Sequence, residues 1–191
     1  MKEIGIKSKG VNNMSTRSYI AIQHADGSID AISCHYDGYP TGVGTTLAED
    51  YQDPQKVQRL ISLGDLSCLG ISPDKVPGEL PELDETTAYH RDRGEKLFIR
   101  HFDTAKELQK SFTNSDAEYL YLYTQAAISK EWTWYASAVY DDSPDYAPGY
   151  TDRAQEAGIT AGQWYPLNQL IEKYNRLVEI NLASLDNLNA Y

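Results

Sequence analysis

The feature that most restricts the fold of this chain is a predicted β-hairpin close to its start. Residues 18–23 (SYIAIQ) and 29–34 (IDAISC) each alternate in the way that β-strands do. Between them stands Asp26-Gly27, a dipeptide typical of tight hairpin turns. Because the first strands form a pair instead of alternating singly with helices, the sequence indicates an α+β fold.

Apolar spacing predicts the remaining elements. Val43, Leu47 and Tyr51 recur every four residues, as on one face of a helix, and Asp53-Pro54 predicts the start of a second helix. The further predicted segments are strands over 97–102, 118–124 and 132–140, a helix capped by Asp103 that runs to Phe112, and a helix from Pro166 onward. The resulting order, β-β-α-α-β-α-β-β-α, predicts a mostly antiparallel sheet of about five strands with helices packed on one face.

The length of 191 residues predicts one domain. Leu, Ile, Val and Phe number only 39, and the 15 Tyr and 3 Trp supply the rest of the apolar core. Residues 1–13 lack apolar periodicity, so we expect a flexible leader followed by a single α+β domain over 14–191. No apolar run is long enough to cross a membrane. The two cysteines, Cys34 and Cys68, imply no disulfide framework and favour a cytoplasmic location.

Charge is the unusual part of the composition. The chain has 17 Lys and Arg against 28 Asp and Glu, a net charge of −11. Because residues 1–13 carry +2, the remainder carries −13. Such a domain lacks the basic surface that direct nucleic-acid binding needs, and anionic membranes do not attract it. A host protein with a basic surface is a compatible partner, although solubility alone also explains the charge.

The run 34–40 (CHYDGYP) places a thiol, an imidazole and a carboxylate within four positions. Cys34 and His35 do not suit a nucleophile–base pair, because neighbours on a strand point to opposite faces. The structural alternative, a tight turn around the Asp-Gly step, is the favoured interpretation of this run. We retain His35, Asp37 and Tyr39 as candidate ligand-binding residues.

A second candidate, 89–96 (YHRDRGEK), is a cationic island in an acidic chain. Two arginines that flank a carboxylate can clamp a phosphate or a carboxylate, and an ion-pair network is the structural alternative. The glycine-rich helix start 41–46 (TGVGTT) offers backbone N–H groups to the same anion, but it lacks the lysine of a P-loop. The candidate ligand-binding residues here are His90, Arg91, Asp92, Arg93 and Glu95, together with Arg17.

The acidic, tyrosine-containing stretch from Tyr140 onward is either a solvated loop or a docking surface for a basic partner. Its candidate partner-binding residues are Asp141, Asp142, Asp145, Tyr146, Asp152 and Glu156. The four histidines lack H-x-x-x-H spacing and the cysteines lack C-x-x-C spacing, so we expect neither a metal site nor a cofactor.

Four motifs in a fixed order resemble those of a known group. They are 16–20 (TRSYI), 34–40 (CHYDGYP), 60–67 (LISLGDLS) and 88–95 (AYHRDRGE). The series resembles a widespread group of small, largely uncharacterised bacteriophage and prophage proteins with T-R-S, D-G-Y-P and R-D-R-G-E signatures, over roughly residues 14–135. The resemblance transfers no catalytic residue, and it implies an accessory protein of a mobile element in a bacterial cytoplasm.

Three functions remain open on this basis. The first is an inhibitor that binds a host protein, in particular one of a defence system, through an acidic surface. The second is a module that sequesters a nucleotide or a nucleotide-derived signal. The third is a small hydrolase that uses His35, Asp37, His90 and Asp92, which is weakest because the sequence reveals no nucleophile–base–orienter set. The sequence therefore favours a non-enzymatic protein of unknown oligomeric state.

Overall fold

The structure is a computed structural model that describes residues 15–75, 85–138 and 157–188. The predicted leader, residues 1–13, lies outside these ranges. The described residues contain helices together with one large sheet, so the α+β prediction is correct at that coarse level.

The predicted hairpin is confirmed, with β1 (Ser18–Gln23) antiparallel to β2 (Ile29–Cys34). At its turn, the Asp26 carboxylate accepts hydrogen bonds from the backbone N–H and the hydroxyl of Ser28, at 3.0 and 2.6 Å. Gly27 has φ +92°, a conformation that glycine adopts without a steric cost. The Asp-Gly step therefore closes the hairpin through both of its residues.

The hairpin is part of a mixed sheet of eight strands, which is larger than the predicted sheet of about five. The strand order is β4-β3-β2-β1-β6-β7-β8, and β5 also pairs with β2. The pairs β1–β6 and β2–β3 are parallel, and the other pairs are antiparallel. The additional strands are β3 (Leu66–Cys68), β4 (Thr87–Ala88), β5 (Arg100–Phe102), β6 (Tyr119–Gln125), β7 (Trp132–Ala138) and β8 (Tyr165–Pro166).

The sequence prediction missed three strands and the parallel pairs for identifiable reasons. β3, β4 and β8 have only two or three residues each, too few to show an alternating pattern. Between β2 and β3 the chain passes through η1 (Pro40–Gly44), α1 (Thr45–Asp50) and α2 (Pro54–Ser62). Such a crossover returns the chain to the same end of the sheet, so that β3 lies parallel to β2.

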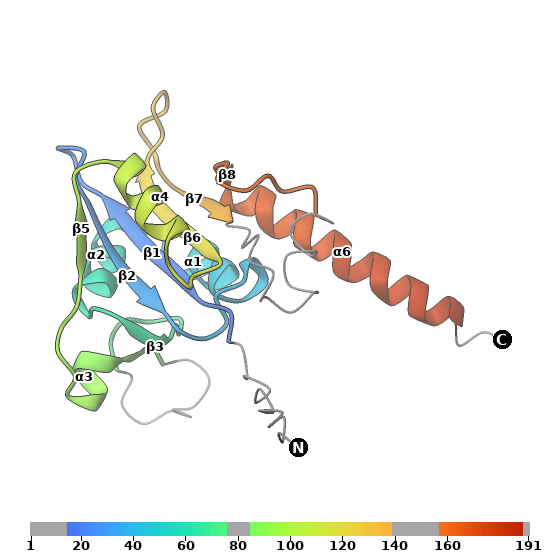
Figure 1. Ribbon diagram of the computed structural model, residues 1–191, viewed down its shortest axis with the longest axis horizontal. Coiled ribbons are helices and arrows are strands. Elements are labelled where there is room, and N and C mark those ends of the chain that lie inside the picture. Colours follow the sequence, from blue (N-terminus) through green and yellow to red (C-terminus); the bar gives the residue numbers. More distant parts are fainter. Residues whose placement is uncertain (1–14, 76–84, 139–156, 189–191) are drawn as a thin grey trace, which may run out of the picture.

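Helices lie on both faces of the sheet, which corrects the prediction of helices on one face (Figure 1). One face is covered by η1, α1, α2 and the start of α6 (Leu167–Leu188), and α4 (Ala105–Thr113) packs on the other. β1 shows the cause, because it is buried on both sides. Two buried apolar clusters flank the sheet, the first under η1, α1, α2 and α6 and the second under α4. Ile20 and Ile22 of β1 belong to the first cluster. Tyr19 and Ala21 belong to the second, beside Leu108 and Phe112 of α4.

Side-chain caps mark the starts of α2 and α4. The Asp53 carboxylate accepts a hydrogen bond from the Gln55 N–H at 2.9 Å, as the sequence predicts for α2. For α4 the cap is Thr104, whose hydroxyl accepts from the Glu107 N–H at 3.2 Å, and not the predicted Asp103. The prediction was therefore one residue early at this helix.

Tyrosine hydroxyls connect the core to backbone carbonyls. Along β6, Tyr119, Tyr121 and Tyr123 point into the first cluster. The Tyr121 hydroxyl donates to the Gly38 carbonyl at 2.8 Å, and the Tyr123 hydroxyl donates to the Gln52 carbonyl. Burying a hydroxyl without such a partner costs free energy. The tyrosine-rich core is therefore also a set of polar contacts that position the loops above it.

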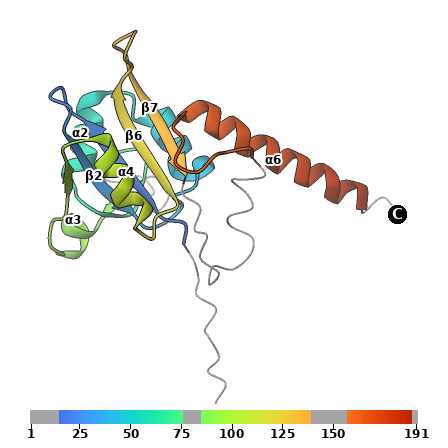
Figure 2. The ribbon, with the colours of Figure 1, turned by 45° about the horizontal axis from the view of Figure 1, so that its top comes forward.

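Helix α6 packs on the sheet only at its start. Leu167, Leu170 and Tyr174 are buried there, and Figures 1 and 2 show the later turns extending away from the body. None of the helices within the described ranges has the length and apolar character that a membrane crossing requires.

The two-sided core leads to a stability prediction. Phe112 is fully buried on the α4 face, so Phe112→Ala should lower the free energy of unfolding by about 3–5 kcal/mol. The exposed Lys106 of the same helix is the control, and Lys106→Ala should change it by less than about 0.5 kcal/mol. Urea denaturation measures both. Equal, small effects would show that α4 does not contribute a second core.

Candidate functional site

The four sequence motifs meet at one end of the sheet, where β2 passes into the loop before η1. The backbone N–H of His35 donates to the Leu66 carbonyl at 3.1 Å, and that of Tyr36 donates to the Ser67 carbonyl at 3.0 Å. These two bonds extend the β2–β3 pairing beyond the strands themselves. The 34–40 motif and the 60–67 motif thus lie side by side.

Two arginines complete this junction. Arg17 Nε donates to His35 Nδ1 at 3.3 Å, and Arg93 Nη2 donates to the Ser67 hydroxyl at 3.0 Å. Burial, followed by the positive charges of Arg17 and Arg93, lowers the pKa of His35. The imidazole is therefore neutral at pH 7, and with Nδ1 accepting a bond its proton lies on Nε2.

The D-G-Y-P motif forms a turn that packs against the residues just before β1. The Gly38 N–H donates to the Thr16 carbonyl at 2.9 Å. A Cβ at position 38 would lie 2.6 Å from the backbone carbon of Arg17, so no larger residue fits without a shift of the chain. Asp37 has φ +56°, and its carbonyl accepts from the Val43 N–H at 2.9 Å. The backbone of this turn is thus held from both sides.

A groove lies beside this turn, between η1 and β3. Its volume is about 250 Å³. Tyr36 and Tyr39, which are 48% and 37% exposed, both line it. The other lining residues are Asp37, Thr41, Gly42, Val43, Thr45, Thr46, Cys68 and Leu69. The carboxylate of Asp37 is the one charged group among these lining residues.

The glycine-rich helix start is closed to an anion. The N–H groups of Gly42 and Gly44 donate to the Tyr39 carbonyl, at 3.0 and 3.4 Å, and that of Val43 is held by Asp37. Gly42 instead makes room for an aromatic ring. A Cβ there would lie 2.5 Å from the Asp37 carbonyl oxygen and 2.8 Å from Cε2 of Tyr39, so the backbone of the turn and the ring both approach too closely for a larger residue.

The R-D-R-G-E motif forms α3 (Tyr89–Arg93) and a structural clamp. Arg91 donates to both carboxylate oxygens of Asp92 at 2.9–3.1 Å, and it also reaches the carbonyls of Pro73 and Thr86. Asp92 in turn accepts from the Ala88 N–H at 2.8 Å, and Lys75 Nζ lies 2.9 Å away. The hydrogen bonds from Arg91, above all, hold the pKa of Asp92 well below its usual range. Arg91 is therefore engaged within the chain.

The other residues of this motif hold its end in place. His90 Nδ1 bonds the Glu95 carbonyl at 2.7 Å, and Gly94 ends α3 at φ +69°. The Arg93 guanidinium lies 4.9 Å from the centre of the Tyr89 ring. None of these residues lines the groove beside Asp37.

Asp65, which the sequence did not single out, fixes the edge of the sheet below the motifs. Its carboxylate accepts from the Ser33 N–H at 2.7 Å and pairs with Arg100 at 2.6 and 3.1 Å. Its carbonyl accepts from the Tyr89 N–H at 3.0 Å. One residue of the 60–67 motif thus connects β2, β5 and α3.

The candidate residues therefore fall into three groups. Asp37 and Tyr39 both line the groove. Tyr36 lines it too, although the sequence analysis did not name it as a candidate; its place directly before Asp37 was the available sequence signal. Arg17, His35 and Arg93 lie at the neighbouring junction, and His90, Arg91, Asp92 and Glu95 belong to the clamp. The partner-binding candidates, Asp141, Asp142, Asp145, Tyr146, Asp152 and Glu156, lie outside the described residues.

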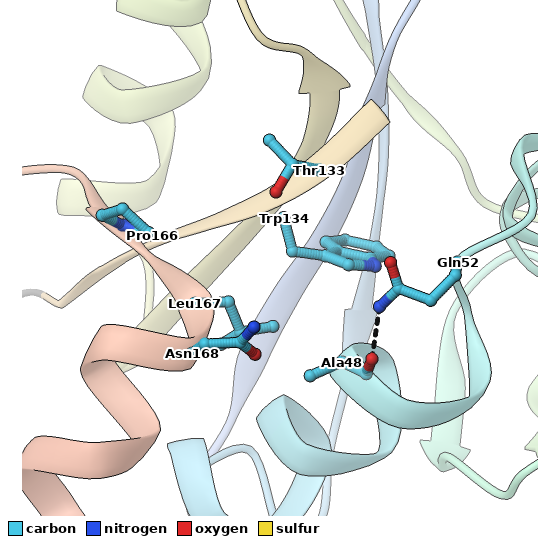
Figure 3. A pocket seen from close by; sticks show the side chains of 7 residues that line it. All are labelled: Ala48, Gln52, Thr133, Trp134, Pro166, Leu167 and Asn168. Atoms are coloured by element: carbon cyan, nitrogen blue, oxygen red, sulfur yellow. Dashed lines mark hydrogen bonds between the residues drawn. The ribbon is translucent and has the colours of Figure 1, made fainter. Parts of the chain in front are cut away.

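A second, smaller pocket carries no ionisable group. Figure 3 shows it between α1, β7 and the start of α6, with the Gln52 side chain bonded to the Ala48 carbonyl. Its volume is about 60 Å³, far below the roughly 300–1,000 Å³ of small-molecule sites. Among the described residues, no three or more His, Cys, Asp or Glu side chains are grouped to hold a metal ion.

Comparisons with known proteins add no relative: no family model, no curated protein and no solved structure matches this chain. The likeness to the phage group thus rests on the four motifs alone.

The turn generates a prediction about Gly38. Gly38→Ala should destabilise the protein by about 1–3 kcal/mol, because the new Cβ presses on backbone that cannot give way. Gly94→Ala is the control, since it faces open space and carries only the cost of a positive φ, about 1–2 kcal/mol. Chemical shifts separate the two, because only Gly38→Ala should disturb the Thr16 and Tyr121 signals. Unchanged signals there would contradict the contact.

Glu118, beside Arg17, generates a pH prediction. Burial raises the pKa of its side chain to about 7, against the opposing charge of Arg17. The unfolded chain releases this proton near 4.5, so between these pH values the folded state binds more protons. Stability should therefore fall as the pH rises through this window.

Glu118→Gln should remove that loss. The urea midpoint of the variant should exceed that of the wild type at about pH 8, and the two should converge at about pH 4. The exposed Glu131 supplies the control, since Glu131→Gln should show no such pH-dependent difference. A Glu118→Gln effect of the same size at both pH values would refute the role of this carboxyl.

Proposed function

We propose that the protein is an accessory protein of a phage or other mobile element that binds a basic surface of a host defence protein and blocks it. One observation carries the proposal. Between Arg17 and Lys56 the chain has six Asp and Glu and no Lys or Arg. This acidic segment, residues 18–55, lies wholly within the part of the chain that the structure describes. This segment contains the hairpin, η1, α1 and the cap of α2.

The position of two of these acids has no explanation in stability. Glu49 and Asp50 are the last residues of α1, where the helix dipole disfavours negative charge by about 0.3–1 kcal/mol each. Neither carboxylate forms an ion pair within the described residues. Negative charge at this end of α1 is available to a partner.

An acidic surface can occupy a groove that normally holds nucleic acid. Its carboxylates then meet the Lys and Arg side chains that would neutralise phosphates, which is a charge-complementary fit. Long-range attraction of this kind speeds encounter and is screened over about 8 Å at physiological ionic strength.

The two alternative functions have less support from the contacts. Nucleotide sequestration needs a free arginine clamp or an open helix start, and Arg91 and the N–H groups of 42–44 are already bonded within the chain. Hydrolysis needs a base held by an orienting group. His35 bonds Arg17 and His90 bonds a backbone carbonyl, so neither histidine pairs with Asp37 or Asp92.

The proposal is tested by expression in bacteria that carry single defence systems. The protein should restore plaque formation by a phage that one of these systems blocks, and it should co-purify with a component of that system. The variant Glu49→Gln with Asp50→Asn should bind that component more slowly, with the difference shrinking at high salt.

The matched control is Asp103→Asn with Glu131→Gln, which changes the net charge equally at exposed sites outside 18–55. The control should associate at nearly the wild-type rate. If no system in a broad panel is relieved, the inhibitor function is wrong. If both double variants slow association equally, net charge matters and the acidic segment does not.

A further inference from the structure

We propose that the groove beside Asp37 captures one basic side chain, a guanidinium or an ammonium group, of the protein partner. This inference rests on the proposed function and adds to it the position of a specific contact. General acidity brings a basic partner near, but it does not fix where the partner binds. The groove supplies the fixed point. Its acceptor groups and aromatic rings suit a cation, and the backbone that carries them is held in place.

The carboxylate of Asp37 stands on backbone that cannot easily move. Its own carbonyl holds the Val43 N–H at 2.9 Å, and the next residue, Gly38, bonds both Thr16 and Tyr121. Asp37 also adopts φ +56°, which is uncommon for residues other than glycine. Asp37, which carries the charge of the groove, thus has a sparsely populated backbone conformation. Such conformations are common at binding sites.

The remaining polar groups of the groove also suit a donor-rich cation. The Tyr39 hydroxyl lies 3.3 Å from Asp37 Oδ1. The hydroxyls of Thr45 and Thr46 donate to backbone carbonyls, which leaves their oxygens as acceptors. Guanidinium and ammonium groups carry only donors, so a carboxylate and several hydroxyl oxygens match them.

Two aromatic rings complete the match. Tyr36 and Tyr39 present partly exposed rings to the groove. A cation over such a ring within about 6 Å is stabilised by about 0.5–1 kcal/mol at an exposed site. No Lys, Arg or His is among the described residues that line the groove. The positive groups nearby, Arg17 and Arg93, are instead held at the junction around His35.

The size of the groove suits a single side chain better than a drug-sized ligand. Its volume of about 250 Å³ lies below the roughly 300–1,000 Å³ of pockets that enclose small molecules. It is also partly open to solvent, and two of its lining side chains, Tyr36 and Tyr39, are exposed. A single side chain projecting from a protein surface can enter it, while the rest of that surface meets the acids of α1.

The experiment uses N-acetyl-arginine amide as the probe, titrated into the whole protein at constant ionic strength. N-acetyl-citrulline amide is the matched control, because it has nearly the same shape without the charge. Two-dimensional NMR should show the signals of residues 36–46 and 68–69 moving with the arginine probe and not with the citrulline probe. The lysine analogue should move the same signals.

Asp37→Asn tests the carboxylate without disturbing the turn, since asparagine tolerates a positive φ and keeps the acceptor for Tyr39. We expect it to weaken probe binding about fivefold, the size of an exposed charge pair. Glu131→Gln is the control of equal charge, at an exposed site outside the groove and outside the acidic segment, and it should leave probe binding unchanged. The signals of Thr16 and Tyr121 report that the turn is intact in each variant.

Equal shifts with arginine and citrulline, or unchanged binding in Asp37→Asn, would overturn the cation site. Shifts on addition of inorganic phosphate at residues 36–46 would overturn it too, because they would indicate an anion site. The proposed function fails separately. If the probe binds as expected but no defence system is relieved, the groove stands and the inhibitor function falls. If relief is full in Asp37→Asn, the function stands and the groove is not its contact.

Discussion

The close approach of Gly38 to the backbone of Thr16 and Arg17 is the constraint on which the motif end of the sheet depends. With 2.6 Å between a would-be Cβ and the Arg17 carbon, only glycine lets the loop after β2 lie against the start of β1. The Gly38 amide is then satisfied by Thr16 and its carbonyl by Tyr121. On the preceding residue, the left-handed Asp37, a second contact fixes the turn, because its carbonyl accepts from the Val43 N–H at 2.9 Å.

The tyrosines explain how a core with few aliphatic side chains can hold a surface loop so firmly. A leucine at position 121 would fill part of the same space and would leave the buried Gly38 carbonyl without its donor, which costs about 1–3 kcal/mol. The hydroxyls at 119 and 123 act similarly, one on Tyr174 of α6 and one on the backbone at the end of α1. A strand in the middle of the sheet thereby positions the loops and helices of one face.

The sequence predicted those parts of the fold that carry a long periodic or turn signal. The β1–β2 hairpin, the Asp53 cap and the long helix α6 are of this kind. It did not predict β3, β4 or the contacts of Asp65, because these depend on residues 19 to 35 positions apart that no local pattern connects. Arg91 illustrates the same limit within the candidate site. An R-D-R pattern looks alike whether its guanidinium faces an external anion or the carbonyls of Pro73 and Thr86, and only the fold decides.

Positive and negative side chains lie close together at the motif end of the sheet. Arg17 and Arg93 lie near His35, the carboxylate of Asp37 lines the groove, and the Tyr36 ring centre lies 4.5 Å from that of His35. A neighbouring cation cluster would repel a basic partner if it were uncompensated. Arg17 is compensated by Asp116 at 2.7 Å, and His35 is neutral. Arg93, which lies against the Tyr89 ring, is the remaining charge. For the basic partner that we propose, attraction at Asp37 and repulsion beside Arg93 would form a gradient that orients its basic side chain.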